Sequence, residues 1–131
     1  MIYKVTVISL WAKDVPATAH FYRDVIGLRL LSHHNDRPHF DINGTYLTIL
    51  KGTPIPAQSS EPEQFPLLAF AVDDLDKAIE NLRNHDIQLP WDVEQDGNSR
   101  WIIFRDPAGN LIELVQYGEH TQSVEGGKTS I

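Results

Sequence analysis

Apolar and polar positions along this chain alternate with two different periods. Residues 3–10 (YKVTVISL) are rich in β-branched and aromatic side chains, which predicts a strand. A helix is predicted next, because Asp14 stands at an N-cap position and apolar residues recur at helical spacing until Gly27. Residues 28–34 then predict a strand, and residues 38–50 predict a hairpin that turns at Asn43-Gly44. The predicted order is βαβββ.

The same pattern starts again about 60 residues later, where Asp74 aligns with Asp14. Residues 65–72 predict a strand, and Asp73-Asp74 caps a helix with an apolar stripe. A weaker strand is expected over residues 87–93, and a last hairpin over residues 100–117. The sequence therefore predicts an α+β fold of two tandem βαβββ modules whose sheets form a cupped mixed sheet.

The two modules are expected to make one domain over residues 1–118. Module 1 covers about 1–51 and module 2 about 65–118. The segment between them, residues 52–64, contains three prolines and few large apolar side chains, which is typical of a linker. Residues 119–131 are polar and rich in glycine, so we expect a flexible tail there.

Side chains of a strand alternate between its two faces, so the turn of a hairpin fixes which residues share a face. A two-residue turn at Asn43-Gly44 places Phe40 opposite Leu47 and His39 opposite Thr48. One face of each sheet is then apolar and suits packing against a helix, while the other face is mixed and would line a pocket if the sheet is curved. The mixed faces carry His39, Asp41, Tyr46, Thr48 and Leu50 in the first hairpin, and Trp101, Ile103, Leu111, Glu113 and Val115 in the second.

The composition of the chain argues against several classes of protein. The 131 residues, 41% of them hydrophobic, suffice for one core. The chain has no cysteine, which excludes disulfides and thiolate chemistry and is compatible with the cytoplasm. The net charge of −7 without a basic cluster argues against nucleic-acid and anionic membrane partners. No apolar run is long enough to span a membrane, and no secretory signal is expected.

Several motifs occur in one order: Asp14-Val15 followed by Phe21-Tyr22, then AFAVDDLDKAI at residues 69–79 and FRDPAGNLIEL at residues 104–114. Together they resemble the vicinal oxygen chelate superfamily, which includes glyoxalase I, extradiol dioxygenases, fosfomycin-resistance transferases and bleomycin-resistance proteins. The resemblance covers residues 3–117. Because small members of that superfamily commonly dimerise, sometimes completing each cup with strands of the partner, it implies a homodimer.

The resemblance also implies four positions at which metal-dependent members hold a divalent ion with His or Glu. In this chain those positions are occupied by Val7, Thr48, Leu67 and Glu113. Valine and leucine cannot donate to a metal, and a threonine hydroxyl is a weak ligand. We therefore expect neither a metal site nor a cofactor. The alternative is a rearranged site in which Glu113 and His39 hold a divalent ion.

Glu113 stands in an otherwise apolar strand, where an isolated charge is costly. Either it lies at a wet pocket mouth and bonds to His39, Thr48, Tyr46 or Trp101, or it binds a donor or cation on a ligand or acts as a general base. His39 is a second candidate base, ligand donor or part of a displaced metal site with Glu113 and Asp41. Trp101 would stack against a planar ligand, or would pack against a dimer partner or the other module.

Three classes of function remain open. The first is metal-independent binding of a small organic molecule, aromatic ones included, as in bleomycin-resistance and related drug-sequestering proteins. The second is an enzyme, either an isomerase or lyase with Glu113 or His39 as base or a metal enzyme with rearranged ligands. The third is a non-catalytic regulatory module. The residues assigned to ligand binding are Trp101, Tyr46, Thr48, Asp41, Ile103, Val7 and Leu67.

Overall fold

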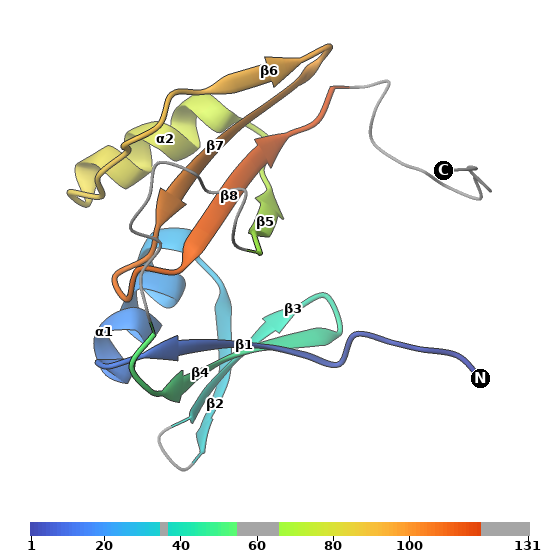
Figure 1. The fold of residues 1–131 in the computed structure, drawn as a ribbon, viewed down its shortest axis with the longest axis vertical. Coiled ribbons are helices and arrows are strands. Elements are labelled where there is room, and N and C mark those ends of the chain that lie inside the picture. Colours follow the sequence, from blue (N-terminus) through green and yellow to red (C-terminus); the bar gives the residue numbers. More distant parts are fainter. Residues whose placement is uncertain (35–36, 55–65, 119–131) are drawn as a thin grey trace. The chain divides into compact units, whose positions relative to one another are not determined.

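The computed structural model describes residues 1–34, 37–54 and 66–118. The chain divides into two compact units (Figure 1). Of the described residues, unit 1 comprises 1–34, 37–54, 66 and 105–111, and unit 2 comprises 67–104 and 112–118. The predicted linker over residues 52–64 lies outside the described residues from residue 55 onward, and so does the predicted tail.

Each unit contains one βαβββ module, and the predicted α+β fold is confirmed. The elements of the first module are β1 (Val7–Ala12), α1 (Val15–His20), the π-helical turn η1 (Phe21–Ile26), β2 (Arg29–His34), β3 (Arg37–Ile42) and β4 (Thr45–Lys51). Those of the second are β5 (Leu68–Ala71), α2 (Leu75–Asn84), β6 (Glu94–Asp96), β7 (Ser99–Arg105) and β8 (Leu111–Gln116).

The two sheets have the same topology. The strand order is β1-β4-β3-β2 in the first and β5-β8-β7-β6 in the second. In each sheet the first strand of the module lies at the edge and pairs in parallel with the last strand of the module. Parallel strands cannot be joined by a tight hairpin, and here a helix and two further strands separate them along the chain.

The helices begin where the sequence predicts. Asp14 accepts a hydrogen bond from the backbone N–H of Ala17 at 3.0 Å, and Asp74 accepts one from Lys77 at 3.1 Å. Gly27 ends η1 with φ of +88°, a left-handed conformation that favours glycine. Sequence periodicity did not predict that the second half of the first helix is π-helical.

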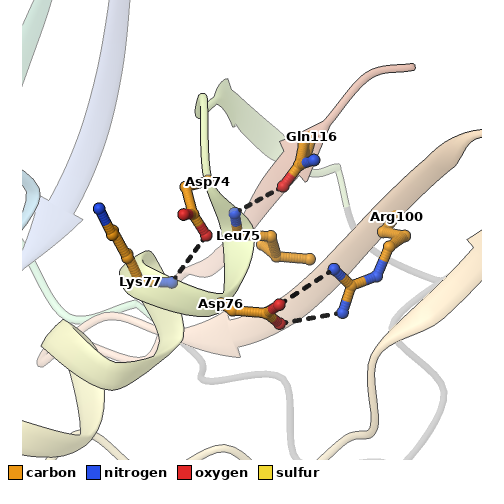
Figure 2. Close-up of polar contacts among 6 residues, drawn as sticks. All are labelled: Asp74, Leu75, Asp76, Lys77, Arg100 and Gln116. Atoms are coloured by element: carbon orange, nitrogen blue, oxygen red, sulfur yellow. Dashed lines mark hydrogen bonds and ion pairs between the residues drawn. The ribbon is translucent and has the colours of Figure 1, made fainter.

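Polar contacts hold α2 on its sheet (Figure 2). The side-chain oxygen of Gln116 on β8 accepts a hydrogen bond from the Leu75 N–H at 2.8 Å, which satisfies one of the free donors of the first turn. Arg100 on β7 donates to both carboxylate oxygens of Asp76, at 3.0 and 3.5 Å. One part-buried hydrogen bond and one exposed ion pair thus hold the same end of the helix.

Each unit has its own apolar core, formed by the predicted helix-packed faces. In unit 1 the buried side chains include Tyr22, Phe40, Leu47 and Ile49. In unit 2 they include Leu75, Leu82, Ile102, Phe104, Ile112 and Leu114. The register of the first hairpin is also confirmed, since Phe40 pairs with Leu47 and His39 with Thr48. Asn43 and Gly44 both have positive φ, as the two-residue turn requires.

Two strand predictions are wrong at their bounds. The first strand begins at Val7 rather than Tyr3. Residues 87–93 form no strand, and β6 lies at Glu94–Asp96 instead. Pro90 has no N–H to donate to a ladder, whereas the Gly97 turn with φ of +59° brings Glu94 opposite Trp101.

The tip of the second hairpin, residues 105–111, belongs to unit 1. Asp106 is 4% exposed, and its Oδ1 accepts hydrogen bonds from the backbone N–H groups of Ala108 and Asn110, both at 2.9 Å. Its Oδ2 accepts from Tyr22 Oη at 2.7 Å and from Asn110 Nδ2 at 3.0 Å. Burial and the Asp106 carboxylate raise the pKa of Tyr22 well above its ordinary value, so the tyrosine remains the donor. The Asp-Pro-Ala-Gly-Asn motif therefore has a structural role, because its Asp106 is the acceptor that holds the turn together.

Candidate functional site

Three polar side chains form one row across β1, β4 and β3 of the unit 1 sheet. Thr48 lies on the central strand β4, paired with Ser9 on β1 and with His39 on β3. Directly opposite residues of neighbouring strands share a face, so all three side chains lie on the face away from Phe40 and Leu47. We name Ser9, Thr48 and His39 the polar row.

Thr48 is an anomaly within the polar row. The residue is only 5% exposed, and its Oγ1 has no hydrogen-bond partner among the described residues. Buried hydroxyls in folded proteins are almost always partnered, because a lost hydrogen bond in a low-dielectric interior costs about 1–3 kcal/mol. The hydroxyl is thus available to a group outside the described residues.

His39 has one ring nitrogen occupied and one available. Its Nδ1 lies 2.9 Å from the carbonyl oxygen of Arg37, which can only accept, so Nδ1 carries a proton and donates. In the neutral ring Nε2 is then an acceptor, able to receive a proton or a hydrogen bond. The ring also meets Tyr46 edge to face, with centroids 6.4 Å apart.

The next row of the same face is largely apolar. Val7 pairs with Tyr46, which pairs with Asp41 on β3. Val7 and Tyr46 are 45% and 44% exposed. Asp41 accepts a 3.3 Å hydrogen bond from the Gly44 N–H, which gives its carboxylate a role in the hairpin turn. The predicted unit 1 residues therefore lie together on one face.

In unit 2 the corresponding face carries the acid. Glu113 on β8 pairs with Ala69 on β5 and is half-buried. No described residue of unit 2 donates a hydrogen bond to its carboxylate. Burial raises the pKa of Glu113, and the charge of Glu94 raises it further. A carboxyl in this state is a better proton acceptor than an ordinary surface glutamate.

Trp101 does not bond to Glu113. Its indole N–H donates to Glu94 Oε2 at 2.9 Å, across the β6–β7 ladder in which the two residues are paired. Trp101 and Ile103, both half-buried, alternate along β7 with the buried Ile102 and Phe104, so they share the opposite face. Leu67, which precedes β5, is 40% exposed. One of the alternatives predicted for Glu113, a bond to Trp101, is therefore wrong.

The two parallel ladders have equivalent registers. In unit 1 Ser9 pairs with Thr48, and Val7 lies two residues before Ser9. In unit 2 Ala69 pairs with Glu113, and Leu67 lies two residues before Ala69. Thr48 and Val7 therefore occupy in unit 1 the places that Glu113 and Leu67 occupy in unit 2.

The donor set does not fit a divalent ion. Of the four equivalent positions two are aliphatic, one is a neutral hydroxyl and one is a carboxylate, whereas hard and borderline ions require several convergent oxygen or nitrogen ligands. Within the described ranges, no group of three or more His, Asp or Glu side chains could hold a metal ion.

Alternation along the first strand gave Ser9 the same face as Val7, but sequence reasoning assigned Ser9 no role. Sequence reasoning missed Glu94, because it expected a strand over residues 87–93 and had no register for β6. A cavity of about 370 Å³ in unit 1 lies beside Lys13, Asp14, Pro54 and Pro107, and none of the predicted site residues lines it.

Comparisons with known proteins agree with this architecture. The model of the Glyoxalase/Bleomycin resistance protein/Dioxygenase superfamily matches residues 4–114, so the chain belongs to that family. The uncharacterized protein YaeR of Escherichia coli (strain K12) is 31% identical over 119 residues, which cover 83% of this chain and 92% of YaeR.

Solved structures show the same fold at lower identity. The fosfomycin resistance protein FosX from Listeria monocytogenes is similar with a TM-score of 0.75 and 20% identity, covering 92% of this chain and 98% of FosX. A glyoxalase/dioxygenase from Nostoc punctiforme gives a TM-score of 0.72 and 24% identity, with 88% and 92% covered. A lactoylglutathione lyase from Agrobacterium tumefaciens gives 0.66 and 22%, with 86% and 92% covered. These likenesses concern the fold, and the chemistry depends on the site.

Proposed function

We propose that this protein binds a small organic molecule without a metal ion and releases it unchanged. The observation that supports the proposal is the donor set: Val7 and Thr48 in unit 1 are equivalent in ladder register to Leu67 and Glu113 in unit 2, and only Glu113 carries a charged donor. A carboxylate without further ligands cannot hold a divalent ion tightly. The same faces carry polar atoms that could bond to a ligand, together with exposed apolar surface. This combination suits a small organic ligand.

The faces of the two units offer different contacts, each taken by itself. In unit 2, Trp101 and Ile103 supply flat apolar surface, and Glu113 supplies an acceptor for a donor or a cation on the ligand. In unit 1, Val7 and Tyr46 supply exposed apolar surface beside the polar row. The family names among the relatives include resistance proteins, which supports a drug or metabolite as ligand.

A screen in the presence of a chelator tests this function. Thermal unfolding is followed with planar antibiotics and aromatic metabolites, with and without EDTA, because a ligand that binds the folded state raises the unfolding temperature by mass action. We expect at least one ligand whose shift is unchanged by EDTA and reduced in Trp101→Ala. A shift that EDTA abolishes would contradict metal independence, and shifts that survive Trp101→Ala would contradict the assigned surface.

One observation favours a second candidate, an isomerase or lyase that uses Glu113 as general base. The raised pKa and the lack of a hydrogen-bond donor from unit 2 are properties of catalytic carboxyls. Glu113→Gln distinguishes the two functions. If Glu113 is a general base, Glu113→Gln should lose turnover and retain its affinity for the ligand. If Glu113 only binds the ligand, Glu113→Gln should change the affinity, and the wild type should show no turnover.

The proposal includes a homodimer in the cytoplasm. Pairing two copies would let a chain of 131 residues bury more apolar surface, and the absence of cysteine suits a reducing compartment. Light scattering coupled to size-exclusion chromatography gives the mass directly. A mass of one chain at micromolar concentration would contradict the dimer.

A further inference from the structure

The polar row of unit 1 carries three hydrogen-bonding groups, and one of them, Thr48, stands in unit 1 where Glu113 stands in unit 2. We propose, on the basis of the binding function above, that the polar row recognises an uncharged group carrying both a donor and an acceptor, such as a primary amide. Ser9, Thr48 and His39 would each contact that group. The ligand would therefore be a neutral amide or a close analogue at this end.

The buried hydroxyl of Thr48 is the strongest observation. Its strand β4 is paired on both sides, with β1 and β3, so the neighbouring backbone groups are engaged in the two ladders. Thr48 Oγ1 has no partner among the described residues while the residue is 5% exposed. A ligand carbonyl that accepts from this hydroxyl would remove the cost of leaving it unpaired.

His39 supplies the complementary acceptor. Because Nδ1 donates to the Arg37 carbonyl at 2.9 Å, the neutral ring presents a lone pair at Nε2. The same bond fixes the orientation of the ring before any ligand arrives, which lowers the entropic cost of binding. An N–H of the ligand is the group that this nitrogen selects.

The polar row itself contains no charged side chain when His39 is neutral. Ser9 is exposed and makes no hydrogen bond to a described residue, so its hydroxyl can donate or accept. Asp41, the acid nearest along β3, accepts from the Gly44 N–H in the turn. A carboxylate ligand would find no cation in the row, and an ammonium ligand would find no anion there. The row therefore favours an uncharged group.

Benzamide is the probe for this inference, and acetophenone is its matched control. Both have a phenyl ring and a carbonyl of the same shape, but only benzamide has N–H donors. Each compound is titrated into ¹⁵N-labelled full-length protein, and the backbone amide signals of both units are followed by NMR. We expect benzamide to shift the signals of Ser9, His39 and Thr48 and to bind at least tenfold more tightly than acetophenone. Equal binding of the two probes at these residues would overturn the proposal.

Thr48→Val tests the hydroxyl itself, with Thr45→Val on the same strand as control. The Thr45 hydroxyl already donates to the Val5 carbonyl at 3.0 Å and is not in the row. We expect Thr48→Val to weaken benzamide binding about tenfold, roughly the loss of one hydrogen bond, while its unfolding temperature is unchanged or raised. Thr45→Val should leave benzamide binding unchanged and lower the unfolding temperature. Unchanged benzamide affinity in Thr48→Val would overturn the proposal.

The same spectra separate this inference from the proposed function. If benzamide shifts only signals of unit 2, such as those of Trp101 and Glu113, the amide site in unit 1 is refuted and the binding function stands. If benzamide shifts the polar row selectively but a ligand of the screen is chemically converted, the inference stands and the proposed function of binding without conversion is refuted. If benzamide shifts no signal, the inference is refuted whatever the screen finds.

Discussion

Units 1 and 2 share the order of their strands, the topology of their sheets and the register of their parallel ladders. They differ in the residue at one equivalent position on the last strand of each module. In unit 1 it is Thr48, a buried neutral hydroxyl without a partner among the described residues. In unit 2 it is Glu113, a half-buried carboxyl with a raised pKa. A repeated backbone register thus fixes where a side chain stands, and a single residue at that place changes the chemistry of the face.

The hairpin turns differ in the same way. The turn at Asn43-Gly44 has two residues and is closed by positive φ angles, with one hydrogen bond from the Gly44 N–H to Asp41. The turn of the second hairpin depends on Asp106, which accepts four hydrogen bonds in a buried position. The first turn is specified by local conformation, and the second by a buried polar network.

The prediction with the largest expected effect tests this difference between the two turns. Asp106→Ala should lower the free energy of unfolding by about 3–4 kcal/mol, because it leaves the Tyr22 hydroxyl and two backbone N–H groups without their acceptor. Asp41→Ala, the matched change in the first turn, should cost about 0.5 kcal/mol. Urea unfolding followed by tryptophan fluorescence measures both. Similar losses in the two variants would contradict the network.

A smaller loss is expected where Gln116 caps α2. Gln116→Ala removes the acceptor of the Leu75 N–H and should lower the free energy of unfolding by about 1 kcal/mol, as for the loss of a helix cap. Gln116→Glu keeps an acceptor and adds a negative charge at the start of the helix, so it should retain most of the stability. Chemical denaturation of the two variants checks the assignment, and equal losses would refute it.

The exposed ion pair between Arg100 and Asp76 should contribute less than the Gln116 cap. Arg100→Ala leaves a mostly exposed carboxylate that water solvates, and surface pairs of this kind are weakened by salt. We therefore expect a small loss at low ionic strength that disappears in 1 M salt. A loss that persists in high salt would show that the stem of Arg100, rather than its charge, contributes by packing.

The smallest effect concerns the pH dependence that Glu113 brings to unit 2. Because the pKa of Glu113 is raised by burial and by Glu94, the folded state holds its proton to higher pH than the unfolded state does. Wild-type stability should therefore fall slightly as pH rises from the ordinary glutamate range through the raised pKa. Glu113→Gln should remove that component, and its gain over wild type should be present at pH 7 and absent at pH 4.

Glu94→Gln provides the control for this component. It removes the neighbouring charge and should reduce the effect, though less than Glu113→Gln does, because burial is the larger cause. Stability measured by denaturation between pH 4 and pH 8 distinguishes these variants. Partial exposure of the carboxyl keeps all of these differences small. A gain from Glu113→Gln that does not vary with pH would refute the raised pKa.

Most of the backbone could be predicted from local patterns. Asp14, Asp74, Gly27 and Asn43-Gly44 mark helix starts, a helix end and a turn by interactions within a few residues. The hairpin register followed from the turn, and it placed His39 opposite Thr48 as observed. The failure at residues 87–93 has a local cause, because Pro90 cannot donate to a ladder and the Gly97 turn sets the register of β6. Apolar periodicity alone does not distinguish a π-helical turn from an α-helix.

The site was less accessible to sequence reasoning than the fold. Alternation along the strands could assign Thr48 and Glu113 to their faces, but that the buried Thr48 hydroxyl has no partner among the described residues emerges only from the structure. The contact of the Trp101 indole with Glu94 depends on the position of β6, which the sequence did not give. The buried role of Asp106 likewise depends on Tyr22, 84 residues away along the chain.

Calorimetric titration of the chelator-treated protein with Ni²⁺, Zn²⁺, Mn²⁺ and Fe²⁺ tests the central claim most directly. Because Val7 and Leu67 offer no donors and Thr48 offers a neutral hydroxyl, we expect no stoichiometric binding of any of these ions, and Glu113→Gln should give the same traces as wild type. Tight binding of one ion per chain that Glu113→Gln abolishes would contradict the claim that this protein works without a metal.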